Sequence, residues 1–226
     1  MKSDKSQAKP APRIELPPLT AFGGDGLETG CDYDGIDFVD QAFTGQDAAD
    51  VRFLECRMEG CCLEGLSLRR ARVVSSLLSE AFGASVDFAD STWRDSQISG
   101  GRLGALILPG ATMKDVRLRG IKLGFVNLAG ARLEDVVFEE CEIGGLDARV
   151  ANLRAVTFLD CSIGELNVAE ATLARVDLSG AKLKTLIGVE SLKGAIISHQ
   201  QMLDLAPLLA ARLGVEVRPD TTGGES

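Results

Sequence analysis

Histidine and cysteine are the residue types in this sequence best suited to nucleophilic or acid–base chemistry. The only histidine is His199, and sites of the Ser–His–Asp or Cys–His kind need a histidine beside the nucleophile. We expect His199 in the first turn of a helix, facing solvent. Of the six cysteines, Cys141 and Cys161 lie twenty residues apart without further metal ligands. We predict no metal site and no cofactor, with a metal or redox pair at these two cysteines as the alternative.

Two pairs of adjacent carboxylates could supply an acid and a base. Glu134-Asp135 and Glu139-Glu140 fall at outward positions of the repeat described below, where ionised side chains are solvated and need no catalytic explanation. Glycine pairs such as Gly100-Gly101 do not open a helix after a strand, as a phosphate-binding loop does. We therefore predict no catalytic residues and no enzymatic activity.

The elements that position these residues follow a period of five. From Phe38 to Leu183, every fifth residue is large and apolar at 27 of 30 positions, and the residue two before each is mostly small or medium and apolar. Two residues after each centre, only Phe125 and Val150 are large and apolar. Inward residues two apart indicate a short extended segment, and the Gly, Asp, Glu and Ser residues between segments indicate turns.

A second period of twenty gives the number of sides. Glycine recurs with this period at Gly104, Gly124, Gly144 and Gly164. Four pentapeptides therefore make one coil, and the tube is square in section. Thirty pentapeptides correspond to 7.5 coils, or a rod about 36 Å long at a strand spacing of about 4.8 Å.

The repeat resembles the A-(D/N)-L-x-x pattern of the bacterial pentapeptide-repeat family. It is carried by Ala111-Thr112-Met113, Ala131-Arg132-Leu133, Ala151-Asn152-Leu153 and Ala171-Thr172-Leu173, and it covers about residues 36–197. The resemblance implies an all-β fold, a right-handed four-sided parallel β-helix, here followed by a short C-terminal α-helical cap. A repeat fold of this kind is a scaffold and does not specify a function.

The two ends of the chain lack the repeat. Residues 1–20 and 218–226 have no periodicity and few apolar groups, so we predict disordered tails around a β-helix of residues 21–197 and a helical cap of residues 198–217. After Leu183 the register slips, because Ile187, Leu192 and Ile197 each come one residue early. This slip predicts an irregular corner near residues 184–186.

The cap is predicted from a capping box and an apolar stripe. Ser198 and Gln201 have the spacing of the box, and Pro207 is expected to kink or split the helix. A cap protects the open end of a β-helix. The stripe is longer than one coil end covers, so a homodimer is the alternative to a simple cap. The predicted dimer interface is Met202, Leu205 and Leu209.

Composition and charge limit the partners. The formal charge of −9 disfavours direct binding to nucleic acid or to anionic lipid, and no apolar run is long enough to cross a membrane. The N-terminus has no apolar signal segment, and the cysteines show no C-x-x-C pair. We predict a cytoplasmic protein whose partner is another protein.

Charge is distributed unevenly along the predicted rod. Residues 94–132 carry a net charge of +5, and residues 133–170 carry −7. Both belts are either solvated surface that keeps the rod soluble or a binding surface. The candidate partner-binding residues are Arg117, Arg119, Lys122, Glu134, Asp135, Glu139, Glu140 and Asp160. Phe125 and Val150 could add apolar anchors or tuck into corners.

Two functions follow from this pattern. The first is a non-enzymatic scaffold for protein interactions, with the partner unknown. The second is implied by the resemblance, since pentapeptide-repeat proteins of the quinolone-resistance kind mimic DNA and bind a type II topoisomerase such as DNA gyrase. Mimicry needs a continuous carboxylate track, but the column Asp95, Asp115, Asp135 is flanked by Arg94 and Lys114. The unbroken register also leaves no room for a protruding loop.

Overall fold

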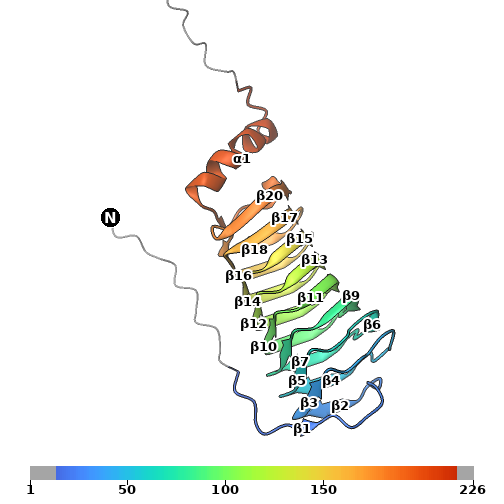
Figure 1. Cartoon of the computed structure of the whole chain (residues 1–226). Helices are drawn as coiled ribbons and strands as arrows, with labels where there is room; N and C mark the ends of the chain where they lie inside the picture. Colours follow the sequence, from blue (N-terminus) through green and yellow to red (C-terminus); the bar gives the residue numbers. More distant parts are fainter. Residues whose placement is uncertain (1–13, 218–226) are drawn as a thin grey trace, which may run out of the picture.

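The protein is a rod of stacked β-coils with one α-helix at its C-terminal end (Figure 1). The computed structural model describes residues 14–217. Successive strands climb the rod from β1 at one end to β20 and α1 at the other. The rod has about nine coils, more than the 7.5 counted from the sequence, because coils before Phe38 and after Leu183 extend the repeat.

Two parallel sheets form the walls of the rod, and each wraps around two of its four sides. The first sheet consists of β1 (Thr20–Ala21), β2 (Asp32–Asp34), β3 (Ile36–Val39), β4 (Arg52–Leu54), β5 (Arg57–Glu59), β7 (Arg72–Val74), β8 (Leu77–Ser79), β10 (Thr92–Ser99), β12 (Thr112–Arg119), β14 (Arg132–Glu139), β16 (Asn152–Leu159), β18 (Thr172–Ala174), β19 (Val176–Asp177) and β21 (Ala195–Ile196). The second sheet consists of β6 (Leu66–Ser67), β9 (Phe82–Asp87), β11 (Arg102–Ile107), β13 (Lys122–Asn127), β15 (Glu142–Asp147), β17 (Cys161–Asn167) and β20 (Ala181–Ile187).

The strand register confirms the twenty-residue coil. Parallel partners are offset by twenty residues from the pair Asp32 and Arg52 through to the pair Asn167 and Ile187. No insertion interrupts this part of the described chain. The interior is a continuous apolar core, because the centre of each side and the residue two before it both point inward, as Val136 and Phe138 do.

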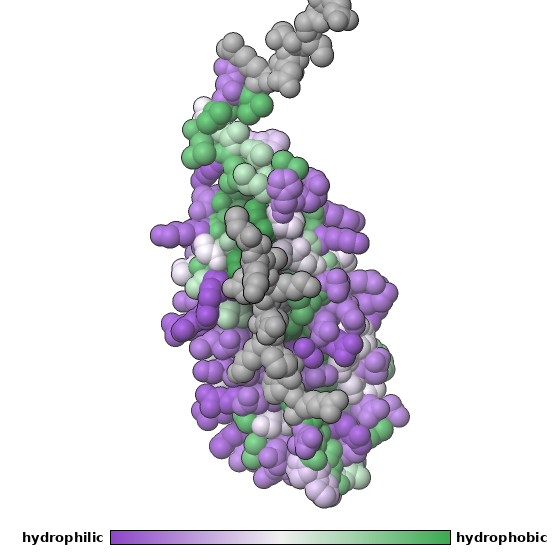
Figure 2. Space-filling view, turned by 90° about the vertical axis from the view of Figure 1, so that its left-hand side faces the viewer, coloured by the Kyte–Doolittle hydropathy of each residue, from purple (hydrophilic) through white to green (hydrophobic). Residues whose placement is uncertain are grey.

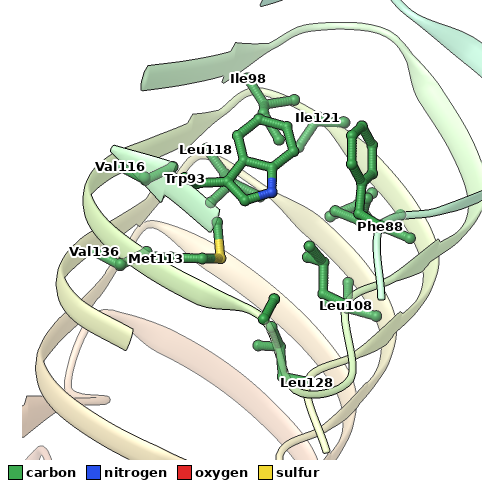
Figure 3. Close-up of a cluster of buried hydrophobic side chains, with 14 of the residues drawn as sticks. Phe88, Trp93, Ile98, Leu108, Met113, Val116, Leu118, Ile121, Leu128 and Val136 are labelled. Atoms are coloured by element: carbon green, nitrogen blue, oxygen red, sulfur yellow. The ribbon is translucent and has the colours of Figure 1, made fainter. Parts of the chain in front are cut away.

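Trp93 is the largest of the fully buried side chains in the core. Its ring lies 4.8 Å from that of Phe88 in an edge-on arrangement, and its indole N–H donates to Ser91 Oγ at 2.9 Å. Figure 3 shows the indole packed among aliphatic side chains from several coils, including Ile98 and Met113. The polar end of Trp93 is thus satisfied inside a mostly apolar core, in which Ser76 and Ser96 are also buried.

The corners of the coils require a left-handed backbone at most positions. Along three of the four edges nearly every corner residue has φ between 47° and 68°, whether it is a glycine or not. Glycine, Asp and Asn adopt this conformation with least strain. The polar and glycine residues predicted as turns therefore occupy these corners.

The slip in register lies later than predicted. The twenty-residue offset persists through Ile187, which faces outward with 40% of its surface exposed, so the predicted corner at 184–186 and the inward position of Ile187 are wrong. One residue is lost between Ile187 and Ala195, where Ala195 pairs with Val176. The 3₁₀-helix η1 (Val189–Ser191) occupies this segment. Leu192 and Ile197 pack against the core, as predicted.

The helix α1 (His199–Arg212) closes the C-terminal end. The predicted capping box is present, since Gln201 N–H donates to Ser198 Oγ and Ser198 N–H donates to Gln201 Oε1. The Gln201 amide also donates to the carbonyl oxygens of Leu178 and Ala181, both at 2.8 Å, which ties the helix to the last coil. α1 continues through Pro207, so the helix is not split there.

The remaining boundaries concern the two ends. Residues 14–19 belong to no helix or strand, and β1 begins at Thr20. Of the tails predicted for 1–20 and 218–226, residues 1–13 and 218–226 lie outside the described residues. Within residues 14–217, no helix is long and apolar enough to span a membrane.

Candidate partner-binding surface

The charged belts predicted from the sequence are built by the stacking of coils. Residues on either side of each inward centre point outward, and equivalent residues of neighbouring coils lie beside each other at the strand spacing of about 4.8 Å. A side chain therefore has its nearest outward neighbour twenty residues away. Whether a charged side chain is paired therefore depends on the charge of the equivalent residue one coil above or below, and less on the net charge of its belt.

The basic and acidic belts pair with each other across adjacent coils. Lys114 Nζ lies 3.5 Å from a carboxylate oxygen of Glu134. On the next side of the rod, Arg119 Nε lies 3.4 Å from Glu140 and 3.9 Å from Glu139. Two further pairs join Arg117 to Glu139 at 3.3 Å and Lys122 to Glu142 at 3.2 Å. We call these ion pairs the ladder; they lie on three neighbouring sides of the rod and join the coil of β12 and β13 to the coil of β14 and β15.

Exposure limits what this ladder contributes to stability. Most of its side chains are about half exposed, and such pairs contribute about 0–1 kcal/mol each. The exception is Arg117 with Glu139, whose side chains are only 25% and 21% exposed. Arg117 Nε and Glu139 Oε2 are buried and lie close together without the geometry of a hydrogen bond.

The structure brings together only part of the predicted set. Arg117, Arg119, Glu139 and Glu140 form one cluster on the strands β12 and β14 and the corner after β14. Glu134 and Lys122 belong to ion pairs on other sides of the rod. Asp135 and Asp160 are corner residues with φ of 53° and 50°, so a backbone requirement accounts for both.

Sequence reasoning missed a second group of ion pairs at the N-terminal end. Arg57 makes two hydrogen bonds to the carboxylate of Asp37, at 2.8 and 2.5 Å, and Arg70 makes two to Asp50, at 2.8 and 2.7 Å. The hydrogen bonds from Arg57 hold the pKa of Asp37 below its usual value. These ion pairs could have been predicted from the sequence, because Asp37 and Arg57, like Asp50 and Arg70, are opposite charges twenty residues apart.

The carboxylate column required for DNA mimicry is short. Asp95, Asp115 and Asp135 occupy the same corner of three successive coils, but the next two positions of that corner are Ala155 and Arg175. Lys114 beside the column is paired with Glu134. A continuous acidic track is therefore limited to three coils, and nothing in this geometry favours the DNA-mimicking alternative.

The structure also shows the surroundings of the histidine and of the two cysteines that were considered as chemical groups. His199 is exposed in the first turn of α1, as predicted. Cys141 and Cys161 are buried, and their thiols donate to the carbonyls of Glu139 and Leu159, both at 3.3 Å. The neighbouring thiol and burial raise the pKa of Cys141 far above its usual value, which keeps it protonated. Among residues 14–217, no group of three or more His, Cys, Asp or Glu side chains could hold a metal ion.

The two outward apolar residues occupy different kinds of corner. Val150 has φ of 59° and is 63% exposed. Phe125 has ordinary backbone geometry, is half exposed, and lies over Gly145 of the next coil. Phe125 therefore tucks into a local corner, whereas Val150 projects into solvent.

The coil of four five-residue sides, each with two inward side chains, decides the architecture. The chain has the pentapeptide-repeat fold. No protein-family model and no curated protein matches the sequence.

Solved structures with a similar shape include HetL, a pentapeptide-repeat protein involved in the regulation of heterocyst differentiation in the cyanobacterium Nostoc sp. strain PCC 7120. It is 16% identical, with a TM-score of 0.39, and the match covers 75% of this chain and 90% of HetL. Full-length QnrB1, a plasmid-mediated fluoroquinolone resistance protein, is 17% identical with a TM-score of 0.34, over 87% of this chain and 98% of QnrB1. Function must therefore be argued from this chain's own surface.

Proposed function

We propose that this chain is a non-enzymatic scaffold that binds another protein. The observation that supports this function is the ladder of paired charged side chains on three sides of the outer surface of the rod. A solenoid of stacked coils presents an extended surface of this kind without the cost of ordering it on binding. Figure 2 shows hydrophilic residues over much of the visible face of the rod.

The place of action that fits this scaffold is the cytoplasm. All six cysteines are free thiols, and four of them are buried in the core. A reducing compartment keeps such thiols unpaired.

A charge swap on the ladder tests the proposal. Exchanging the partners, with Arg119→Glu and Glu140→Arg in one variant, keeps the ion pair while it inverts the pattern that a partner meets. We expect the wild-type protein to capture a specific partner from native lysate, identified by mass spectrometry, and the swapped variant to capture it at least tenfold less. Circular dichroism should show the same fold for both. The proposal fails if the wild-type protein enriches nothing beyond a control with the affinity tag alone.

A second variant, measured by the same partner capture and in cells, tests whether the protein is an enzyme. His199→Ala removes the only imidazole, which lies exposed outside the core. We expect this variant to capture the same partner and to function as the wild-type protein does in cells. Loss of function with folding intact would contradict the non-enzymatic assignment.

A further inference from the structure

A shallow groove runs along the side of the rod formed by β11, β13, β15, β17 and β20. Its volume is about 470 Å³, and it extends over the coils from Arg102 to Lys184. One wall is the column of outward residues Arg102, Lys122, Glu142, Ser162 and Lys182. This side of the rod carries none of the ladder except the pair between Lys122 and Glu142.

The floor of the groove is bare backbone for a steric reason. A Cβ added at Gly124, Gly144 or Gly164 would approach the carbonyl oxygen of the glycine one coil below more closely than the 3.0 Å that real Cβ atoms keep. The corner residue that directly follows each position of this column changes its backbone conformation along the rod. The first two coils use Gly45 and Gly65 with φ of 65°, but the corresponding residues from 85 to 165 do not have a left-handed backbone. The glycine column thus belongs to the second corner type, and it leaves a channel between rows of side chains.

The walls give the groove a positive charge in a chain of net charge −9. Four cations line it, Arg102, Lys122, Lys182 and Lys184, against the single carboxylate of Glu142. That carboxylate lies 3.2 Å from Lys122 Nζ. The other three cations form no ion pair within the described residues, so their charge is available to an anionic ligand.

The groove continues into a cleft beneath α1. This cleft has a volume of about 240 Å³ and shares Leu183 and Lys184 with the groove. Its lining is mostly apolar, through Leu186, Leu205 and Leu208. Asp204 also lines it but accepts a hydrogen bond from Gln200 at 2.9 Å. A basic channel therefore ends in an apolar pocket.

We propose that this continuous groove binds an extended acidic peptide segment of a partner protein, with an apolar side chain of that segment in the cleft beneath α1. The proposal rests on the proposed scaffold function and names the partner's chemistry. The glycine floor covers about four coils, or roughly 19 Å, which matches about five or six residues of extended chain. Carboxylates along the segment would meet Lys182, Lys184 and Arg102.

A peptide fits this groove better than a nucleic acid does. The overall charge of −9 repels a polyphosphate at long range, whereas a short peptide with a few carboxylates meets the local field of the groove at close range. The apolar cleft at its end suits an aliphatic side chain and offers little to a sugar–phosphate backbone.

Fluorescence anisotropy with a designed probe tests the proposal on the full chain. The probe is a fluorescein-labelled decapeptide of alternating Glu and Ser that ends in two Leu residues. We expect saturable binding below about 1 mM protein and at least tenfold weaker binding by the variant Lys182→Glu with Lys184→Glu. The matched control is Arg94→Glu with Arg154→Glu, the same charge change at exposed residues of β10 and β16. This control should retain at least half of the wild-type affinity.

Several results would contradict the proposal that the groove binds an acidic peptide. They are no binding of the probe, equal loss in the two double variants, or equal or tighter binding of a labelled ten-nucleotide oligothymidylate. Partner capture from lysate separates this failure from failure of the scaffold function. If the Lys182→Glu, Lys184→Glu variant captures the wild-type partner in full, the scaffold stands and the groove does not serve it.

Discussion

At the scale of single residues, Val150 places a β-branched side chain where the backbone is left-handed. Its φ is 59°, and other coils have Asp50, Asp90, Gly110 and Gly130 at the same corner, together with Arg70 and Glu170. A left-handed conformation costs an ordinary L-residue about 1–2 kcal/mol, and a β-branched residue bears this cost without a polar side chain to offset it.

Replacing this valine should therefore stabilise the rod. Val150→Asn is expected to raise the free energy of unfolding by about 1 kcal/mol, since Asn tolerates the left-handed region. The measurement is the shift in the urea midpoint. Val39→Asn is the matched control, because Val39 is exposed in the strand β3 with ordinary backbone geometry, and it should give no gain. A lower midpoint for Val150→Asn would show that the corner is not strained.

Asp147 offers a second test at this scale, through pH. Its carboxylate accepts hydrogen bonds from the Arg149 backbone N–H at 3.1 Å and from the Arg149 guanidinium at 2.7 and 2.9 Å, and these bonds lower the pKa of Asp147. A lowered pKa in the folded state stabilises the protein above the unfolded value of about 3.9, and this contribution is lost as the pH falls through the folded value.

Asn fits the same column, where Asn127 and Asn167 accept the equivalent backbone hydrogen bond. Asp147→Asn should therefore remove only the charged part of the interaction. We expect the variant to be less stable by about 1 kcal/mol at pH 7 and equal to the wild-type protein near pH 2, as measured by urea unfolding at both values. A difference that persists unchanged in acid would mean that the charge of Asp147 plays no part.

At the scale of elements, the glycine column accompanies the second type of corner, whose residues do not have a left-handed backbone. Gly144 and Gly145 are neighbours in β15 but differ in surroundings. A Cβ on Gly144 would clash with a backbone carbonyl of Gly124, which cannot move without disturbing the ladder. On Gly145 it would lie 3.1 Å from the ring of Phe125, which can rotate away.

These surroundings predict unequal effects of the same substitution. Gly144→Ala should lower the free energy of unfolding by about 2 kcal/mol or more, whereas Gly145→Ala should change it by less than about 1 kcal/mol. Thermal unfolding followed by circular dichroism measures both. Equal shifts would indicate that the glycine column is not required by the close approach of the coils.

The sequence predicted these elements to different degrees. The period of five was readable because every coil repeats the same inward pair, as in Val136 and Phe138. The late slip was misplaced because Ile187 is apolar and its type alone does not distinguish an inward position from an exposed one. The ion pairs between the belts were not predicted, because charge summed along the chain does not show the partner one coil away, as Glu134 is for Lys114. The groove was not predicted, because the recurrence of glycine every twenty residues indicated the length of a coil but not the open space above the glycines.

At the scale of the whole molecule, the surface of α1 decides whether the rod acts alone. Leu205 is buried within the chain, so it belongs to the cap and not to an exposed interface. Leu209 is half-buried. Met202 and Leu203 remain about half exposed, and apolar residues gather at the C-terminal end of the rod in Figure 2. Adjacent exposed apolar side chains on a terminal helix are typical of an interface.

Pairing of two such caps would give a symmetric dimer, in which each rod covers the exposed residues of the other. We expect light scattering at micromolar concentration to report about twice the 23.9 kDa of one chain. Met202→Glu with Leu203→Glu should return the mass to that of one chain, because each cap would then bury charge against its copy. The control Val39→Glu adds a charge at an exposed apolar residue far from α1 and should leave the dimer intact. A wild-type mass near 23.9 kDa would mean that α1 serves as a cap alone.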